Sequence, residues 1–455
     1  IAVQKAEPDS FANVDIAQLA EAGERLHDAT LRAEAHRLRG MVANAAGRPD
    51  DARRELGLAI DLLRGTDRPD LLAGALRMRG FIEMFSGSLV DAEWFFGEAD
   101  GLYRRLDDRR GMAYVQQNRA FVSFMSGDLT RARQQLHDAA ETLESLGDRN
   151  GVGWAIGLLA FVEFFEGHFD EAEELADTVR REAEQRGDEW ATAMMDSLTA
   201  DLRLWQGRLE DAHQLAERAR VRFKRLDDRF GLGQALAPLV RSQIALGRTT
   251  AAQRTVEELI SLSTGSRQGV FPIGAAAGAA MHRGNGAVAV QLAERALTEL
   301  EHTGGMVFEP TVMLCIACLQ VGDIERAETA IADLPDFGRD QPFAAAAAAL
   351  LATLAHRPEQ AIERAAVVIR AHGATYLDQV IAHVAAAGAH KQMGAFAPAR
   401  LDAEAAVARA TSVGDVVAIA FATAAHHRIT DEPDSHVADT ATLGEGWATV
   451  VSLLT

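Results

Sequence analysis

Several residue types are scarce in this chain, and each scarcity limits what the protein can be. Eleven prolines among 455 residues leave room for many uninterrupted helices. Two cysteines, Cys315 and Cys318, are too few for a disulfide framework, so we expect a reducing compartment, the cytoplasm. No apolar run reaches the roughly 18 residues that a membrane span needs, and residues 1–10 resemble neither a basic nor an apolar leader.

Positive charge and catalytic motifs are also lacking. The formal net charge of −20 argues against direct contact with nucleic acid, because such binding depends on basic patches that neutralise phosphates. The sequence contains no GxxxxGK[ST] phosphate loop, no HExxH and no strand-borne GxGxxG. Cys315 and Cys318 share a helix face but have no second ligand pair for zinc, so we interpret them as core thiols. The sequence therefore predicts no enzyme, no cofactor and no metal site.

One turn signature returns every 40 residues in the first half of the chain. A glycine is followed five residues later by an alanine in six segments, which begin at Gly47, Gly87, Gly127, Gly167, Gly207 and Gly247. A fixed period of this size marks a stacked-repeat protein, in which each unit buries its apolar face against its neighbours. Within one period, residues 111–125 and 129–146 predict two helices joined by a tight turn, with Asp128 as the N-cap of the second helix.

Small residues recur at three fixed places in the period, where paired helices must approach closely. The position seven residues before the turn glycine holds, in successive repeats, Gly40, Gly80, Ala120, Ala160, Ala200 and Val240. Alanine also recurs five and twelve residues after that glycine. This set of columns resembles the tetratricopeptide repeat (TPR). The usual early Trp and closing Pro of that repeat are missing, and the closing turns read LDDRRG, LGDRNG and LDDRFG. Such repeats resemble the TPR modules of large bacterial ATP-dependent signalling and transcription regulators, including the maltose-activator type.

The resemblance implies an all-α, right-handed superhelical solenoid of about ten helix pairs. Residues 31–265 carry the regular 40-residue repeats, and residues 266–428 carry irregular, Ala-rich repeats that look mainly structural. A turn-rich join at 261–272 marks the expected boundary. A polar loop and a capping helix are expected in residues 429–455. Residues 1–30 are either a repeat that has lost its first helix, which suggests a chain cut from a longer polypeptide, or a terminal capping helix.

Aromatic residues recur near the ends of the first helices. In TPR proteins particular first-helix positions line the concave groove, and the resemblance implies the following groove positions. They are Phe81, Phe121 and Phe161, continued by Asp201 and Arg241; Phe85, Phe165 and Trp205; and Tyr114 and Trp154. An exposed apolar floor of this kind marks a partner or ligand site. Aromatics at helical spacing are also typical of a core, so we expect some of these rings to be buried and others to line the groove.

A polar set accompanies the aromatic residues. Arg37, Arg77 and Gln117 occupy another groove position by the same resemblance, and arginine suits a carboxylate or phosphate ligand. Local pairing is the alternative for the neighbouring arginine column, because Arg79 and Glu83 are four residues apart on one helix. Gln117 and Asn118 would clamp the backbone of an extended peptide, as similar amides do in peptide-receptor TPR proteins.

These features predict a non-catalytic binding or sensor module of a cytoplasmic signalling or transcription regulator. It would take a protein, a peptide or a small ligand into its concave groove, without touching nucleic acid or membrane. The alternative function is a stand-alone scaffold that holds protein complexes together. An enclosed pocket would favour the sensor, whereas an open and uniformly wide groove would favour the scaffold.

Overall fold

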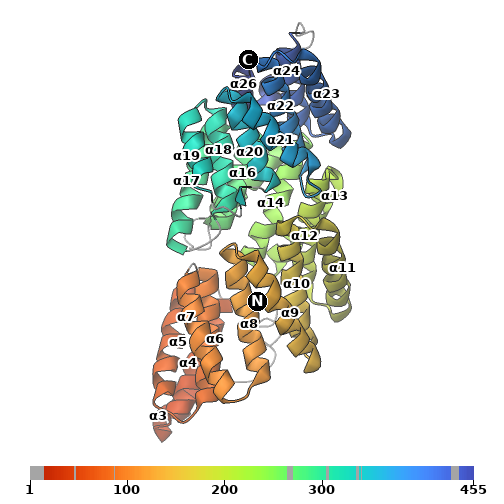
Figure 1. Cartoon of the computed structure of the whole chain (residues 1–455). Helices are drawn as coiled ribbons and strands as arrows, with labels where there is room; N and C mark the ends of the chain where they lie inside the picture. Colours follow the sequence, from red (N-terminus) through yellow and green to blue (C-terminus); the bar gives the residue numbers. More distant parts are fainter. Residues whose placement is uncertain are drawn as a thin grey trace. The chain divides into compact units, whose positions relative to one another are not determined.

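A computed structural model describes residues 15–45, 48–86, 88–263, 270–303, 307–334, 338–339, 341–431 and 440–454 (Figure 1). The described residues form α-helices joined by short turns and contain no strand, so the expected all-α solenoid is confirmed. The helices fall into two compact units. Unit 1 is Ile1–Phe165, Glu174–Ala191 and His302–Met306, and unit 2 is Glu166–Glu173, Thr192–Glu301 and Val307–Thr455. Among the described helices, none is long and apolar enough to cross a membrane.

Unit 1 is a row of helices in which each helix from α3 to α9 packs against its chain neighbour. Its helices are α3 (Ile16–Leu26), α4 (Ala29–Ala45), α5 (Pro49–Arg64), α6 (Pro69–Ser86), α7 (Leu89–Arg105), α8 (Arg109–Met125), α9 (Leu129–Ser145), α10 (Arg149–Glu166) and most of α11 (Phe169–Arg186). The turn before α9 contains the predicted turn glycine and the predicted N-cap. Gly127 has φ of 85°, which glycine adopts without strain, and the Asp128 side chain accepts the Arg131 N–H at 3.1 Å as an N-cap.

The aspartate and the glycine of the LDDRRG and LGDRNG turns each have a clear structural role. Asp108 caps α8 by accepting the Gly111 N–H at 2.9 Å, and Asp148 caps α10 in the same way through Gly151 at 3.1 Å. A Cβ atom on Gly111 would overlap the ring of Tyr103 from the preceding helix. The aspartate therefore fixes the start of α8 and of α10, and the glycine at Gly111 lets the preceding helix approach α8.

The small-residue columns lie at the expected close contacts between paired helices. Ala92 and Ala132 are completely buried. A Cβ atom on Gly80 would lie 2.7 Å from Cε1 of Phe96, whose ring is also completely buried. The glycine at this position thus leaves the space that the Phe96 ring fills, and interiors packed to this density have little slack for an added methyl group.

Unit 2 contains α12 (Glu189–Gln206) from residue 192 onward and all later helices. These are α13 (Leu209–Arg225), α14 (Arg229–Ala245), α15 (Thr249–Ser263), α16 (Val270–His282), α17 (Gly286–Thr303), α18 (Phe308–Gln320), α19 (Ile324–Ala332), α20 (Pro342–Leu354), α21 (Pro358–Arg370), α22 (Tyr376–Gln392), α23 (Phe396–Val413), α24 (Val416–Thr430), α25 (Thr440–Leu443) and α26 (Glu445–Ser452). Helices α14, α16, α18, α20, α22 and α24 pack in that order, and α24 also packs against α14. The first helices of the repeats in unit 2 therefore close into a ring.

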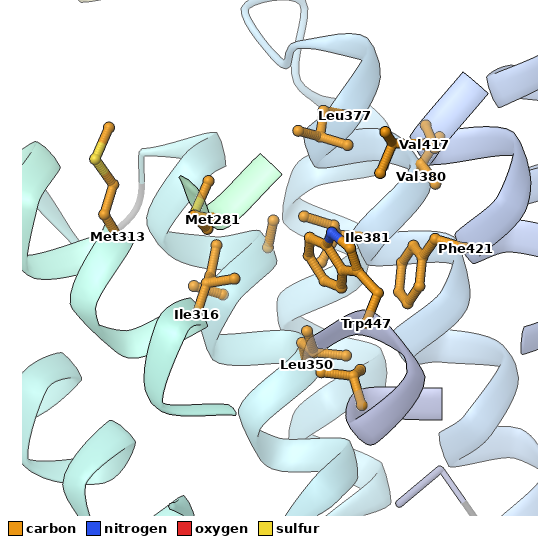
Figure 2. Packing of buried hydrophobic residues seen from close by; sticks show 14 of the residues in the cluster. Met281, Met313, Ile316, Leu350, Leu377, Val380, Ile381, Val417, Phe421 and Trp447 are labelled. Carbon is orange, nitrogen blue, oxygen red and sulfur yellow. The ribbon is translucent and has the colours of Figure 1, made fainter. Parts of the chain in front are cut away.

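The last helix packs into the core of this ring. Trp447 of α26 is 1% exposed, and its ring centroid lies 4.5 Å from that of Phe421 on α24. Figure 2 shows the indole between Ile381 and Phe421, above Leu350. Its Nε1 donates a hydrogen bond of 2.9 Å to the carbonyl oxygen of His282 at the end of α16. A residue near the C-terminus thereby ties together helices that are far apart in the sequence.

Several sequence predictions fall on residues outside the described ranges. They concern the turn at residues 7–12, the turn glycines Gly47 and Gly87, residues 264–269 of the join, and residues 432–439 of the polar stretch. Those predictions stay as they are. The two cysteines can be assessed: Cys315 and Cys318 are completely buried free thiols of α18, as predicted.

Candidate functional site

Aromatic rings from α6, α8 and α10 form a continuous series in unit 1. We call the following six rings the aromatic series: Phe81, Phe85, Phe121, Phe124, Trp154 and Phe165. Ring centroids are 4.8 Å apart for Phe81 and Phe85 and 5.1 Å apart for Phe85 and Phe121. Phe121 lies 6.3 Å from Trp154. The aromatic series thus runs from one first helix to the next. The distances between its ring centroids are those that favour tilted aromatic pairs.

The rings differ in how far solvent reaches them. Phe81 and Phe121 are only 5% and 8% exposed, so most of their surface belongs to the core of unit 1. Phe85, Trp154 and Phe165 are half-buried, and so is Phe161, which the sequence placed in the column of Phe81. A partner can therefore reach part of this face, and the buried rings hold the accessible ones in position.

Asn118 is the polar group that stands out on this face. It lies four residues after Tyr114 and three before Phe121 on α8, so the three side chains share one side of the helix. Asn118 is 6% exposed, and its buried Oδ1 has no hydrogen-bond partner within the described residues. Leaving a buried amide oxygen unpaired costs about 1–3 kcal/mol. The arrangement is therefore suited to a donor that arrives with a ligand.

The neighbouring Gln117 is engaged within the protein. Its side chain is 2% exposed, and Nε2 donates a hydrogen bond of 2.5 Å to the carbonyl oxygen of Gly151 on α10. This bond joins two adjacent first helices. In the ligand-free chain the Gln117 amide therefore donates its hydrogen bond to α10 and holds α8 against that helix. The Asn118 oxygen beside it has no partner among the described residues.

Tyr114 and Arg77 form the polar rim of the face. The Arg77 guanidinium lies 5.4 Å from the centroid of the Tyr114 ring, a cation–π distance. The Tyr114 hydroxyl donates to Asp148 Oδ2 at 3.0 Å. Burial, together with the negative charge of Asp148, raises the pKa of Tyr114 to about 12. The phenol therefore stays neutral at physiological pH and holds its ring against the rim.

Two other arginines singled out from the sequence, Arg37 and Arg79, are paired on their own helices. Arg37 binds Glu34, with Nη2 and Oε1 2.6 Å apart, and Arg79 binds Glu83 at 2.7 Å, as the local-pairing alternative predicts. Arg119 is paired with Glu93 of α7. Trp205 belongs to unit 2, where its ring packs edge-on against Phe169 at 5.6 Å.

Four charged side chains of unit 2 influence one another's ionisation. Arg241 on α14 acts electrostatically on Asp201 of α12, Glu309 of α18 and Asp378 of α22. The column argument placed Asp201 and Arg241 at groove positions, whereas Glu309 and Asp378 come from the irregular repeats and were not singled out from the sequence. No sequence signal links them, because their repeats do not share the 40-residue spacing.

A buried polar triad joins three helices of unit 2. Asp415, the N-cap of α24, is ionised and can only accept hydrogen bonds. Its Oδ2 lies 2.8 Å from His282 Nε2 and 2.7 Å from the Tyr376 hydroxyl. Burial by itself would raise the pKa of Asp415, but His282 and Tyr376 outweigh it and lower that pKa to about 2. The triad therefore fastens α24 to α16 and α22.

The comparisons with known proteins show a similarity to a solved structure. No family model matches the chain, and no curated protein matches it. Among solved structures, the chain is similar to a Signal Transduction ATPase with Numerous Domains (STAND) protein with a tetratricopeptide repeat sensor from Pyrococcus horikoshii. The identity is 13% and the TM-score 0.42, over 81% of this chain and 55% of that protein. The chain thus spans about half the length of that protein, and a similarity at this TM-score carries no argument about function.

Proposed function

We propose that the chain is a non-catalytic, TPR-like binding module whose unit 1 takes an extended peptide segment of a partner protein. The observation that carries this proposal is the unpaired Asn118 amide on the same face as the aromatic series. An extended peptide presents backbone N–H and C=O groups together with side chains on alternate sides. Its N–H would satisfy the Asn118 oxygen, and its apolar side chains would cover Phe85, Trp154 and Phe165.

The chemistry of the face favours a peptide over a purely apolar ligand. An apolar ligand would cover the rings but would leave the Asn118 amide unpaired and even less hydrated. An asparagine amide offers an acceptor and two donors, which matches the acceptor and donor of a peptide unit. A few aromatic anchors with a well-placed polar group are typical of binding hot spots.

Selection from a random peptide library on the intact chain tests this function. Enriched peptides should carry apolar side chains, and calorimetry should show that Asn118→Ala weakens the best peptide about tenfold, as expected for loss of a buried hydrogen bond. The variant should fold as stably as the parent, because it removes an amide that has no partner in the free protein. Asn150→Ala, the same change at an exposed position of α10, is the matched control. Absence of enrichment, or equal effects of the two changes, would contradict the proposal.

The module would serve a cytoplasmic signalling or transcription regulator as its sensor, by its resemblance to the TPR modules of bacterial regulators of the maltose-activator type. Peptide binding can act as a signal only if the ligand binds two states of the module with different affinities. Hydrogen exchange with and without the selected peptide distinguishes the sensor from a scaffold. A sensor should show altered protection well beyond α6, α8 and α10, whereas a scaffold should change only at the contact face.

A further inference from the structure

Helix α7 of unit 1 has an apolar side that is largely open to solvent. Val90 and Trp94, about one turn apart, are 77% and 52% exposed. Gly97 and Gly101 follow on the same side of the helix, because residues three and four positions apart are neighbours on a helix surface. We call these four residues the α7 face. It presents a large indole beside a stretch of bare backbone.

The two glycines of the α7 face are not required by the packing of the chain. A Cβ atom on Gly97 would have no neighbour within 4 Å, and one on Gly101 would meet only the end of the Arg105 side chain, 3.9 Å from Nη1. Gly111 differs, because a Cβ atom there would overlap the ring of Tyr103. Glycine inside a helix is destabilising relative to alanine, and close approach of another group is one reason to retain it.

The next two second helices are polar at the same places of the repeat. Forty residues further on, α9 has at these positions Thr130, Gln134, His137 and Glu141. Another forty residues on, α11 has a charged residue at all four positions. The apolar α7 face therefore departs from the solvated faces that follow it, and apolar groups gathered on a surface mark an interaction site.

Opposite charges lie at the two ends of this helix. The first turn of α7 contains Asp91, and its last turn contains Arg104 and Arg105. Asp91 and Arg105 are exposed, and they flank the same edge of the α7 face because the distance between them is about four whole turns. An antiparallel copy of the helix would place the acidic end of each beside the basic end of the other. A parallel copy would bring like charges together.

We propose that two copies of this chain associate through the α7 face, with the two helices antiparallel about a two-fold axis. The axis would place Trp94 of each copy against Gly101 of the other. It would also place Asp91 of each copy beside Arg105 of the other. One axis serves both contacts, because the midpoint of both pairs lies at residues 97–98. A surface that contains both halves of its own contact is what an isologous interface requires.

The size of the α7 face sets the expected strength of the contact. A helix of 17 residues is about 25 Å long, so one helix pair buries less area than a standard protein–protein interface. We therefore expect a weak dimer, with a dissociation constant in the micromolar range or above. The inference does not depend on the peptide face, which lies on the first helices α6, α8 and α10.

Analytical ultracentrifugation of the full chain without peptide tests the inference. The parent chain should pass from monomer to dimer as its concentration rises from about 1 µM to about 500 µM. Trp94→Ala should weaken the dimer at least about tenfold, as expected for a central aromatic anchor. Phe396→Ala removes an exposed ring of α23 in unit 2. It is the matched control and should leave dimerisation unchanged.

Gly97→Ala gives a second readout, which a merely structural role would not produce. The added methyl group has open space in the single chain, and alanine favours a helix. The thermal stability of the monomer should therefore stay the same or rise. The dimer should nevertheless weaken at least about tenfold, because the methyl groups would hold the two backbones apart.

Charge reversal tests the antiparallel arrangement. Asp91→Arg and Arg105→Asp should each weaken the dimer several-fold, because each places like charges side by side at both ends of the contact. The double variant exchanges the two charges and should restore the affinity of the parent.

Three results would overturn the inference. The first is a chain that stays monomeric over the whole concentration range. The second is a dimer that Trp94→Ala and Gly97→Ala leave unchanged, since another surface would then hold it. The third is a double charge variant that associates no better than the single variants. A failure of peptide selection would affect none of these measurements.

Discussion

Replacing Asp415 by alanine should destabilise unit 2 by about 4–7 kcal/mol. The carboxylate accepts four hydrogen bonds: from the N–H groups of Val417 at 2.9 Å and Ala418 at 3.1 Å, and from His282 and Tyr376 at 2.8 and 2.7 Å. Asp415 and His282 are 0% and 1% exposed. Water therefore cannot replace the lost partner without opening the ring of first helices.

The magnitude follows from the separate contributions. Loss of a helix N-cap costs about 1 kcal/mol. Each hydrogen bond to a charged group contributes about 1.5–3 kcal/mol, and Asp415 forms two with the buried side chains His282 and Tyr376. These contributions add to about 4–7 kcal/mol. Breaking a buried pair by removing one partner costs about 3–5 kcal/mol, which agrees with the lower part of this range.

Asp323→Ala is the matched control, because Asp323 also caps a helix of unit 2. It accepts one backbone N–H, that of Arg326 at 3.1 Å, and no buried side chain, so its loss should cost about 1 kcal/mol. Hydrogen exchange under mild denaturant, followed by mass spectrometry of peptides from α16, α22 and α24, reports the stability of this part of the chain. Equal losses of protection in the two variants would refute a fastening role for Asp415.

The same residue predicts an acid-sensitive ring. The folded pKa of Asp415 is lowered from 3.8 to about 2, so its contribution is fully present above about pH 4 and is lost as the pH falls towards 2. Linkage over this interval amounts to about 2 kcal/mol. Protection of α24 should fall over that window in the parent chain and stay flat in Asp415→Asn.

Three further changes test other parts of the structure. The folded pKa of Asp201 is raised to about 8. The ligand-free chain should therefore lose stability from about pH 4 to about pH 8, because the unfolded chain ionises this carboxyl group at a lower pH than the folded chain does. Thermal melts of Asp201→Asn should lack that loss. Phe121→Ala should cost about 3–5 kcal/mol in urea denaturation and half-buried Phe161→Ala clearly less; equal costs would contradict the assigned burial. Gly80→Ala should cost about 1–3 kcal/mol, and adding Phe96→Leu should recover part of it in a double-mutant cycle.

The repeat architecture could be predicted because its signals are local. The predicted helices at 111–125 and 129–146 correspond to Arg109–Met125 and Leu129–Ser145. A residue with positive φ, Asp107 or Gly127, and a capping aspartate, Asp108 or Asp128, precede these two helices, and such residues act within one turn of the chain. The small-residue columns could also be predicted from the sequence, because the paired helices of every repeat must approach one another closely at the same positions.

The closure of unit 2 could not be predicted in this way. The bond between His282 and Asp415 joins residues 133 positions apart, and the one between Trp447 and His282 spans 165 positions. Neither separation is a multiple of the 40-residue repeat length. In unit 1 the sequence placed Phe81 and Phe85 on the same helix end, but their unequal burial depends on how far each repeat rotates against its neighbour, which a periodic pattern does not specify.

One repeat position shows how the two kinds of information combine. The column of Phe81, Phe121 and Phe161 continues through Asp201 to Arg241, so the same place in the period carries rings in unit 1 and charges in unit 2. Periodicity alone would treat the change as a loss of the binding surface. Arg241 instead acts on Glu309 of an irregular repeat, because its charge opposes the rise that burial causes in the pKa of Glu309. One place in the repeat can therefore change its chemistry along the chain, and an interaction with a residue of an irregular repeat becomes recognisable only in the structure.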